Sequence, residues 1–405
     1  MPAPLHRTTV VILLSSLLVF TGIGLLQTML PMRADLEHFS AAMIGGQGAA
    51  YFAGFIAGCM LGPRLIRSVG HIRAFAGMVA ILATVVLVFP VWVQPVVWLA
   101  LRLGSGCCLA IIVMAQESWL NDQADNDNRG RMLSLYFIIS NLGWMIGQSA
   151  VNLCPLTDST LFMLVTGLIC ISVAPVALAP TREPKQIPSA RIDLRGLLAL
   201  SPVGAIGAFL VGTTEGAFWT LGPVYGQQLG MSVFEVTVLM GSFVLGGTLS
   251  QWPIGHLSDY YDRRVVILPV VLLTVATGLA IAFIGKLEFH LMVPLAILHG
   301  ALMVPIYSLC LAHVNDNAPT DRFVQVSGGL LLIYSTGAAI GPLTAPFAMF
   351  YFGPGGLFIY NAAILAVFAL IIVLRILSNR NLRVHPHHYS LTNKTTQTIY
   401  ELEEP

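Results

Sequence analysis

Twelve apolar runs dominate this sequence and limit what it can fold into. Each run is about 20 to 27 residues long, which is enough for one helix to cross a hydrocarbon core of roughly 30 Å. Only 10% of the residues are charged, whereas soluble domains carry roughly a quarter, and the mean hydropathy is +0.80. We therefore expect an all-α membrane protein with twelve transmembrane helices. The runs cover residues 8–31, 43–66, 72–93, 95–120, 131–153, 159–180, 197–224, 233–257, 265–285, 289–314, 324–350 and 355–377.

Lys and Arg are distributed unevenly between the segments that join the runs. Of 20 such residues, 17 lie on the side shared by both termini, Arg33 and Lys286 lie on the other side, and Arg102 lies inside a run. Because basic loops stay in the cytosol, we expect both termini to be cytosolic. The first run has no convincing small-residue cleavage site before Arg33, so we expect it to be retained as a helix.

The two halves of the chain repeat one pattern. TGIGLLQTMLP at 21–31 matches TTEGAFWTLGP at 213–223 in two Thr, one Gly and one Pro, and the offset of 192 to 193 continues to Arg129 and Arg322. Two six-helix halves of the same orientation form parallel repeats, an arrangement found in transporters. We therefore predict an N-terminal six-helix bundle (1–180), a cytosolic linker (181–196), a pseudo-symmetric C-terminal six-helix bundle (197–377) and a disordered cytosolic tail (378–405).

Small residues recur at four-residue spacing on four runs that occupy equivalent places in the repeat. Such faces let helix backbones approach closely in lipid, where helices gain little from hydrophobic association. We expect them to form an interface between the halves, while static packing is the alternative for any single pair. The positions are Gly54, Gly58 and Gly62; Gly143 and Gly147; Ser242, Gly246 and Ser250; and Gly337 and Gly341.

The turn GHLSDYYDRR at 255–264 holds four charged side chains in ten residues. Its carboxylates and guanidinium groups predict a latch that pairs the two halves at the cytosolic face. A solvated loop whose arginines only set the topology is the alternative. The turn resembles the signature G-x-L-x-D-x-x-G-R-R of the major facilitator superfamily, with Asp262 replacing the second Gly and matches at Gly255, Leu257, Asp259, Arg263 and Arg264.

This resemblance covers all twelve runs and implies the two-bundle fold and transport function of that superfamily. In the first half the same turn, PRLIRSVGHIR at 63–73, keeps Gly70 but has Arg67 where the family usually has Asp. We hypothesise that the acidic partner moved to Glu117, which would accept Arg67 or Arg129. The predicted latch therefore consists of Arg67, Glu117, Arg129, Asp259, Arg263, Arg264 and Arg322.

Two further patterns refine the resemblance. Arg102 and Gly106 are similar to the family pattern R-x-x-x-G, which is often linked with proton coupling. Gly143 and Gly147 form G-x-x-x-G, but Gln148 stands where exporters of the family have Pro, so the direction of transport stays open. Together with Arg67, the context of Glu117, Ser118, Leu120 and Asn121 resembles the bacterial YcaD-like branch.

Three ionisable side chains lie inside the runs at comparable depth: Arg102, Glu215 and His299. A charge near the bilayer centre costs about 2.5 to 3.5 kcal/mol or more, which argues for a partner or a wet cavity. The resemblance implies that their three runs help to line a central cavity. We predict that Arg102 and Glu215 form an ion pair or a substrate clamp, and that Glu215 with His299 supplies the titratable site for proton coupling. A purely structural pair, and a hydrogen-bonded interior histidine, are the alternatives.

Five further side chains are candidates for lining the same cavity with aromatic walls and a few directional polar groups. Each alone fits ordinary packing or anchoring at the membrane interface equally well. They are Gln27, Thr28, Gln116, Trp219 and Tyr307.

The sequence predicts no cofactor and no metal. The six cysteines form no C-x-x-C pair, and His385, His387 and His388 in the tail lack a second ligand cluster. A phosphate-binding G-x-x-x-x-G-K-[ST] loop and an H-E-x-x-H motif are both missing from the sequence, which argues against ATP drive and against an enzyme.

These observations together predict a secondary active transporter that moves a small organic solute by alternating access, coupled to protons as a symporter or antiporter. An organic anion, a zwitterion and a cation all fit one Arg and one Glu. We expect a monomer in the lipid bilayer with no nucleic-acid partner, since the basic residues follow membrane sidedness. A transporter-like membrane sensor that binds solute without flux is the alternative.

Overall fold

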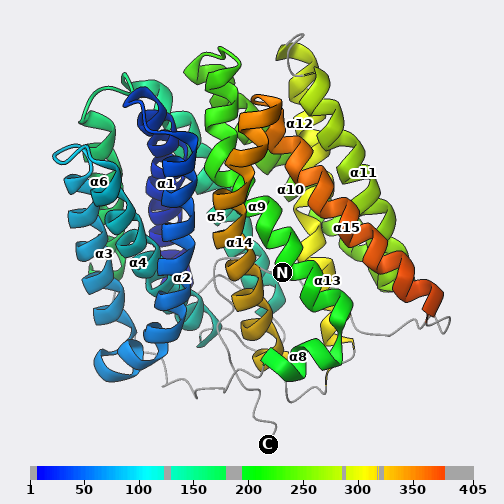
Figure 1. Ribbon diagram of the computed structural model, residues 1–405. Coiled ribbons are helices and arrows are strands. Elements are labelled where there is room, and N and C mark those ends of the chain that lie inside the picture. Colours follow the sequence, from blue (N-terminus) through cyan, green and yellow to red (C-terminus); the bar gives the residue numbers. More distant parts are fainter. Residues whose placement is uncertain are drawn as a thin grey trace, which may run out of the picture. The chain divides into compact units, whose positions relative to one another are not determined.

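The computed structural model describes residues 7–122, 129–178, 194–284, 289–316, 318 and 323–378. Within these ranges every regular element is a helix (Figure 1). The helices are α1 (Arg7–Leu36), α2 (Ala41–Val69), α3 (His71–Val88), α4 (Pro95–Asp122), α5 (Arg129–Ala150), η1 (Val151–Leu153), α6 (Thr160–Ile171), α7 (Val173–Leu178), α8 (Leu194–Leu200), α9 (Pro202–Gln228), α10 (Val233–Tyr260), α11 (Arg263–Ile284), α12 (Phe289–Met303), α13 (Pro305–Asn315), α14 (Phe323–Phe352) and α15 (Gly356–Ser378).

Ten spans in the described residues are long and apolar enough to cross a membrane. They are α1 to α4, α6 with α7, α10, α11, α12 with α13, α14 and α15. The remaining long helices, α5 and α9, contain 22 and 27 residues and carry more polar side chains in their central turns. At 1.5 Å per residue both are still long enough to span a bilayer. The predicted all-α membrane protein with twelve helical crossings is therefore confirmed.

Two of the predicted runs are each divided into two helices. The run 159–180 breaks at Ser172, and the run 289–314 breaks at Val304. Pro175 and Pro305 follow these breaks, and a proline has no N–H to donate to the preceding turn. A hydropathy profile shows one apolar segment in each case, because the helix break changes the backbone conformation and not the polarity of the side chains.

The described helices form two compact units. Unit 1 contains α1, α2 from Ala50 onward, and α3 to α7; unit 2 contains residues 38–49 and α8 to α15. Most of the linker and nearly all of the tail predicted from the sequence lie outside the described residues, so those domain boundaries stay predictions. His385, His387 and His388 lie outside them as well.

Equivalent helices of the repeat pack in equivalent pairs within each unit. In unit 1, α1 packs along α5 and α3 packs against α6; in unit 2, α9 packs along α14 and α11 packs against α15. The sequence offset relates α1 to α9 and α3 to α11, so the two units repeat one packing scheme.

The glycine faces serve packing within a unit, which corrects our expectation of an interface between the halves. A Cβ added to Gly143 or Gly147 would lie closer than 3.0 Å to backbone atoms of α1, and one added to Gly337 or Gly341 would do the same to α9. Gly54 and Gly58 approach α4 in this way, and Gly246 approaches α12. Each Gly lets two backbones of the same unit cross closely, because a side chain there would have no room.

Candidate functional site

Arg102 lies in a polar cluster that α1, α2 and α4 form within unit 1. Its Nη2 donates a hydrogen bond to Oε1 of Gln27 at 2.7 Å, and its Cζ lies 4.5 Å from the centroid of the Tyr51 ring. The side chain is only 4% exposed, and within the described part of the chain its Nε and Nη1 have no hydrogen-bond partner. The structure therefore joins two predicted site residues, Arg102 and Gln27, and adds Tyr51.

Gly106 explains how the ring comes to lie over the guanidinium. It is one turn after Arg102 on α4, and a Cβ at this position would clash with the backbone of Tyr51 on α2. The missing side chain brings the two helices together, so the face of the Tyr51 ring meets the cation and a cation–π contact forms. The R-x-x-x-G spacing thus has a steric role here, and no pattern in the sequence pointed directly to Tyr51 as the partner.

Glu215 lies in a second buried cluster, within unit 2. It is 1% exposed on α9, and Tyr334 on α14 donates a hydrogen bond to its Oε2 at 2.7 Å. The ring of Tyr307, on α13, meets the ring of Tyr334 edge to face at 4.9 Å between centroids. Sequence reasoning named Glu215 and Tyr307 but missed Tyr334. The available signal was a tyrosine inside an apolar run, because a buried Tyr hydroxyl usually needs a partner.

His299 lies in an interior position between α12, α11 and α15. Its Nδ1 is 2.8 Å from Oγ1 of Thr277, whose proton is donated to the carbonyl of Leu273 or Thr274. Nδ1 is therefore hydrogen-bonded to this hydroxyl, and Nε2 has no partner among the described residues. Phe243 and Phe358 pack beside the ring at 5.7 Å each. Glu215 is not among the described contacts of His299, so the structure does not join this predicted pair.

The other cavity candidates differ in their surroundings. Gln116 on α4 donates to Ser15 on α1 at 3.2 Å, and Ser15 donates to the carbonyl of Ser172 at 2.8 Å, so Gln116 links helices inside unit 1. Trp219 contacts Phe243 with 5.6 Å between the ring centroids. Thr28 is 2% exposed on α1, one residue after Gln27.

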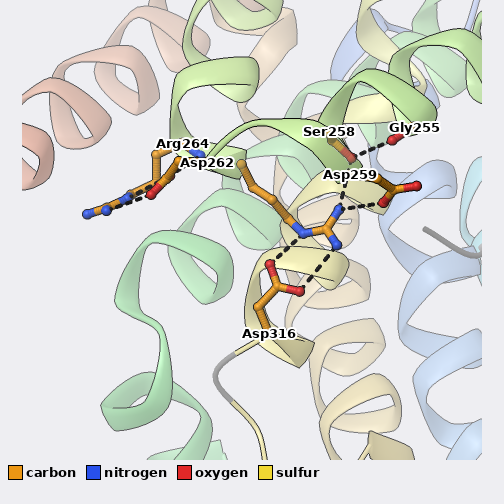
Figure 2. A network of polar contacts seen from close by, with 7 residues as sticks. Gly255, Ser258, Asp259, Asp262, Arg264 and Asp316 are labelled. Carbon is orange, nitrogen blue, oxygen red and sulfur yellow. Dashed lines mark hydrogen bonds and ion pairs between the residues drawn. The ribbon is translucent and has the colours of Figure 1, made fainter. Parts of the chain in front are cut away.

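The charged turn between α10 and α11 forms an ordered network (Figure 2). Arg263 binds both carboxylate oxygens of Asp316, with Nε to Oδ2 at 2.6 Å and Nη2 to Oδ1 at 3.2 Å. Its Nη1 donates to Oγ of Ser258 at 2.9 Å and lies 3.7 Å from Asp259. Sequence reasoning missed Asp316, which ends α13 and lies 53 residues from its partner.

Asp262 explains why this turn departs from the family signature. Its Oδ1 accepts a hydrogen bond from the backbone N–H of Arg264 at 2.9 Å and its Oδ2 pairs with the Arg264 guanidinium at 2.9 Å, so Asp262 caps the start of α11. The equivalent turn in unit 1 instead uses Gly70 at φ 86°, a left-handed backbone that favours glycine. The two turns therefore reach the same chain reversal by different means.

The predicted latch residues Asp259, Arg263 and Arg264 find partners inside unit 2. Arg67 is exposed, and its Nε donates to the carbonyl of Pro63 on its own helix at 3.1 Å. Glu117 is 5% exposed on α4, and the neighbouring Ser118 lies 2.5 Å from Nε2 of His71. The side chain of Arg129 and all of Arg322 lie outside the described residues. Pairing across the halves stays a prediction.

Comparison with known proteins identifies the family. The sequence profile of the Major Facilitator Superfamily matches residues 5–201 and 204–397. The chain belongs to the major facilitator superfamily. Among the curated proteins of this family, the uncharacterized MFS-type transporter YcaD of Escherichia fergusonii is 27% identical over 372 residues, covering 91% of this chain and 96% of the relative. The protein of the same name from Shigella flexneri is 27% identical over 371 residues, with the same coverage.

Solved structures of the superfamily have the same fold. The nucleoside transporter NupG aligns with a TM-score of 0.76 at 13% identity, over 91% of this chain and 99% of that one. A bacterial homologue of the human lysosomal transporter Spinster, in an inward-facing and occupied conformation, aligns with a TM-score of 0.70 at 16% identity. The alignment covers 92% of this chain and 96% of that one. The human organic anion transporter MFSD10 aligns with a TM-score of 0.60 at 16% identity, over 90% of this chain and 99% of that one. At these identities the alignments establish the fold alone.

Membership of the superfamily confirms several sequence predictions. The chain is a multi-pass membrane protein with the two-domain fold of a bacterial MFS transporter family, and it is a transporter and not an enzyme. The resemblance to the YcaD-like branch is confirmed as well. Transporters of this superfamily bind small-molecule substrates within the membrane, so the buried polar clusters around Arg102 and Glu215 are the places to examine.

Proposed function

We propose that this transporter moves a small organic solute by alternating access, driven by coupling to protons. One observation supports the proposal: unit 1 buries Arg102 at 4% exposure and unit 2 buries Glu215 at 1% exposure, two ionisable side chains of opposite sign. In this superfamily the counterparts of α4 and α9 line the central cavity. Burying such groups costs several kcal/mol unless something compensates the charge, and transport function supplies a reason to keep them.

Glu215 is the proposed proton-coupling group. A buried carboxylate can exchange a proton when its surroundings change between two conformations. Tyr334 holds Oε2 in a fixed direction at 2.7 Å, which keeps the carboxylate available in one orientation. His299 is hydrogen-bonded to Thr277 among aromatic rings, which favours the interior role for this histidine. The coupling proposal therefore rests on Glu215.

The charged turns take a supporting part in this proposal. Asp259, Arg263 and Arg264 would act as a latch at the cytosolic face together with the first-half residues Arg67, Glu117 and Arg129. The bias in Lys and Arg supports cytosolic termini in the inner membrane, and the transporter is proposed to work as a monomer. A reporter protein that fluoresces only in the cytosol, fused after Pro405, should fluoresce; a dark but full-length fusion would contradict this orientation.

The test of function begins with a ligand. Purified protein is screened for solutes that raise its thermal unfolding midpoint at two pH values, because a ligand that binds the folded state stabilises it by mass action. The hit is then followed into proteoliposomes with an imposed pH gradient. Accumulation should follow the gradient in the wild type and be lost in Glu215→Gln, which removes the ionisable oxygen and keeps the shape.

Glu235→Gln is the matched control. Glu235 is a carboxylate at the start of α10 that accepts hydrogen bonds from Ser232, and Gln preserves this capping box. We expect this variant to accumulate solute like the wild type. Full gradient-driven accumulation by Glu215→Gln would contradict proton coupling through that residue, and a bound solute that never crosses would point to a sensor.

A further inference from the structure

We propose that the substrate is an organic anion with a single carboxylate, and that this carboxylate binds the free N–H groups of Arg102. The inference rests on the proposed transport function and names the chemical class that the site accepts. It starts from what Arg102 lacks inside unit 1.

The charge of Arg102 has no anionic counterpart in the described part of unit 1. The closest polar partner of the guanidinium is the neutral amide of Gln27, and its other contact is the face of the Tyr51 ring. The ion pair of unit 1 that the structure describes is Arg33 with Glu37, near the end of α1. A buried charge without a counter-ion is expensive, so the site is arranged to receive a negative charge from elsewhere.

The unused donors define how an anion would bind. Nη2 already donates a hydrogen bond to Gln27. Nε and Nη1 have no hydrogen-bond partner among the described residues, although Arg102 is only 4% exposed. Nε–H and Nη1–H point to different sides of the planar guanidinium, and each forms a fork with an N–H of Nη2. A carboxylate would therefore bind one of these free donors together with the second N–H of Nη2, and such charge-assisted bonds are among the strong ones.

Tyr51 restricts the approach and favours an organic ligand. Cζ of Arg102 lies over the ring at 4.5 Å from its centroid, so an anion cannot approach the guanidinium from the side that the ring occupies. Phe52 and Phe55 continue the aromatic surface, at 5.2 and 6.5 Å from the Tyr51 ring. An apolar body beside these rings would gain contact that an inorganic ion cannot. Because Arg102 is one cation with neutral neighbours, it matches a ligand with one negative charge better than a ligand with two.

Ligand stabilisation of the purified full chain tests this with three matched probes. Benzoate carries a carboxylate on an aromatic body, benzamide has the same shape without charge, and benzylamine has the opposite charge. Benzoate should raise the thermal unfolding midpoint in a saturable manner, and benzamide and benzylamine should not. Inorganic phosphate as a fourth probe should also have no effect. Stabilisation by benzylamine or phosphate without benzoate would overturn the proposal.

Two substitutions place the binding at Arg102. Arg102→Gln should raise the apparent Kd of benzoate about tenfold or more, because the charge-assisted bonds are lost. Arg375→Gln removes an exposed arginine near the end of α15 and should leave the Kd unchanged. Equal loss in both, or none in Arg102→Gln, would contradict the site.

Gln27→Glu gives a readout even where Arg102→Gln does not fold. The new carboxylate would lie at hydrogen-bond distance from Nη2 of Arg102, where Oε1 of Gln27 lies at 2.7 Å, and would act as a built-in competitor. We expect a higher unfolding midpoint without ligand and loss of the benzoate effect. Unchanged benzoate binding in this variant would overturn the proposal.

The outcomes separate this inference from the transport proposal. Benzoate binding that depends on Arg102, without flux in proteoliposomes, would support the anion site and contradict transport. Flux of a different solute class that depends on Glu215, without any carboxylate binding, would support transport and overturn the anion site.

Discussion

Arg263 and Asp316 form a two-pronged ion pair that ties the start of α11 to the end of α13. Both side chains are nearly buried, at 3% and 6% exposure, and the two contacts are 2.6 and 3.2 Å long. The geometry resembles the strong pairing of Arg with carboxylate in which two parallel bonds fix the orientation. The pair gives the charged turn a structural role inside unit 2, whether or not it also acts as a latch.

Removing one partner of this pair should be costly. Asp316→Asn leaves the Arg263 guanidinium without its main counter-charge, and breaking a buried pair costs about 3 kcal/mol or more. The thermal unfolding midpoint in detergent should fall clearly. Glu37→Gln breaks the pair of Arg33, in which Glu37 is 31% exposed, and should cost about 1 kcal/mol or less. Equal small shifts would mean that Ser258 and Asp259 satisfy Arg263 without Asp316.

Glycine substitutions test whether the small-residue faces pack within a unit. Gly147→Ala on α5 and Gly341→Ala on α14 should both destabilise, because the added Cβ would clash with the backbone of α1 or α9. Gly77→Ala on α3 is the control, since no heavy atom beyond its own helix turn lies within 4 Å of the added Cβ. This change should be neutral or stabilise by up to about 1 kcal/mol, because Ala favours helix. Unfolding in detergent should therefore show a clear loss of stability for Gly147→Ala and Gly341→Ala and no loss for Gly77→Ala.

The sequence predicted the spans and the buried charges but not their partners. Hydropathy finds a span because roughly 20 apolar residues are needed whatever they pack against, so α1 and α15 were predictable. Tyr334 and Asp316 lie 119 and 53 residues from the side chains they bind. Gln116 was predicted to line the cavity because the resemblance places its helix beside the cavity. Residue spacing alone does not determine which neighbouring helix a given face of that helix contacts.

The hydrogen bond between Tyr334 and Glu215 should appear as a coupling energy. Tyr334→Phe removes the donor at 2.7 Å and should cost about 1 to 3 kcal/mol in a wild-type background. In Glu215→Gln the same change should cost less, because the charged acceptor is already gone. Unfolding midpoints of the two single variants and the double variant measure this. Tyr360→Phe, which breaks an exposed contact with Thr344, should have a small effect in both backgrounds. Strict additivity of Tyr334→Phe and Glu215→Gln would contradict the coupling.

The last prediction separates the two roles considered for His299. If this histidine is an interior hydrogen-bonding residue, Thr277→Val should remove the hydroxyl that lies 2.8 Å from Nδ1 and cost about 1 to 3 kcal/mol. His299→Gln should also lower the unfolding midpoint.

Neither change should abolish solute accumulation driven by a pH gradient, because the proposed coupling group, Glu215, remains. The measurement is gradient-driven uptake in proteoliposomes at matched amounts of folded protein. If His299→Gln instead retained full stability and lost only the dependence on the gradient, His299 would carry the proton. Nε2, which is buried without a partner among the described residues, would then be the atom to test as the site of protonation.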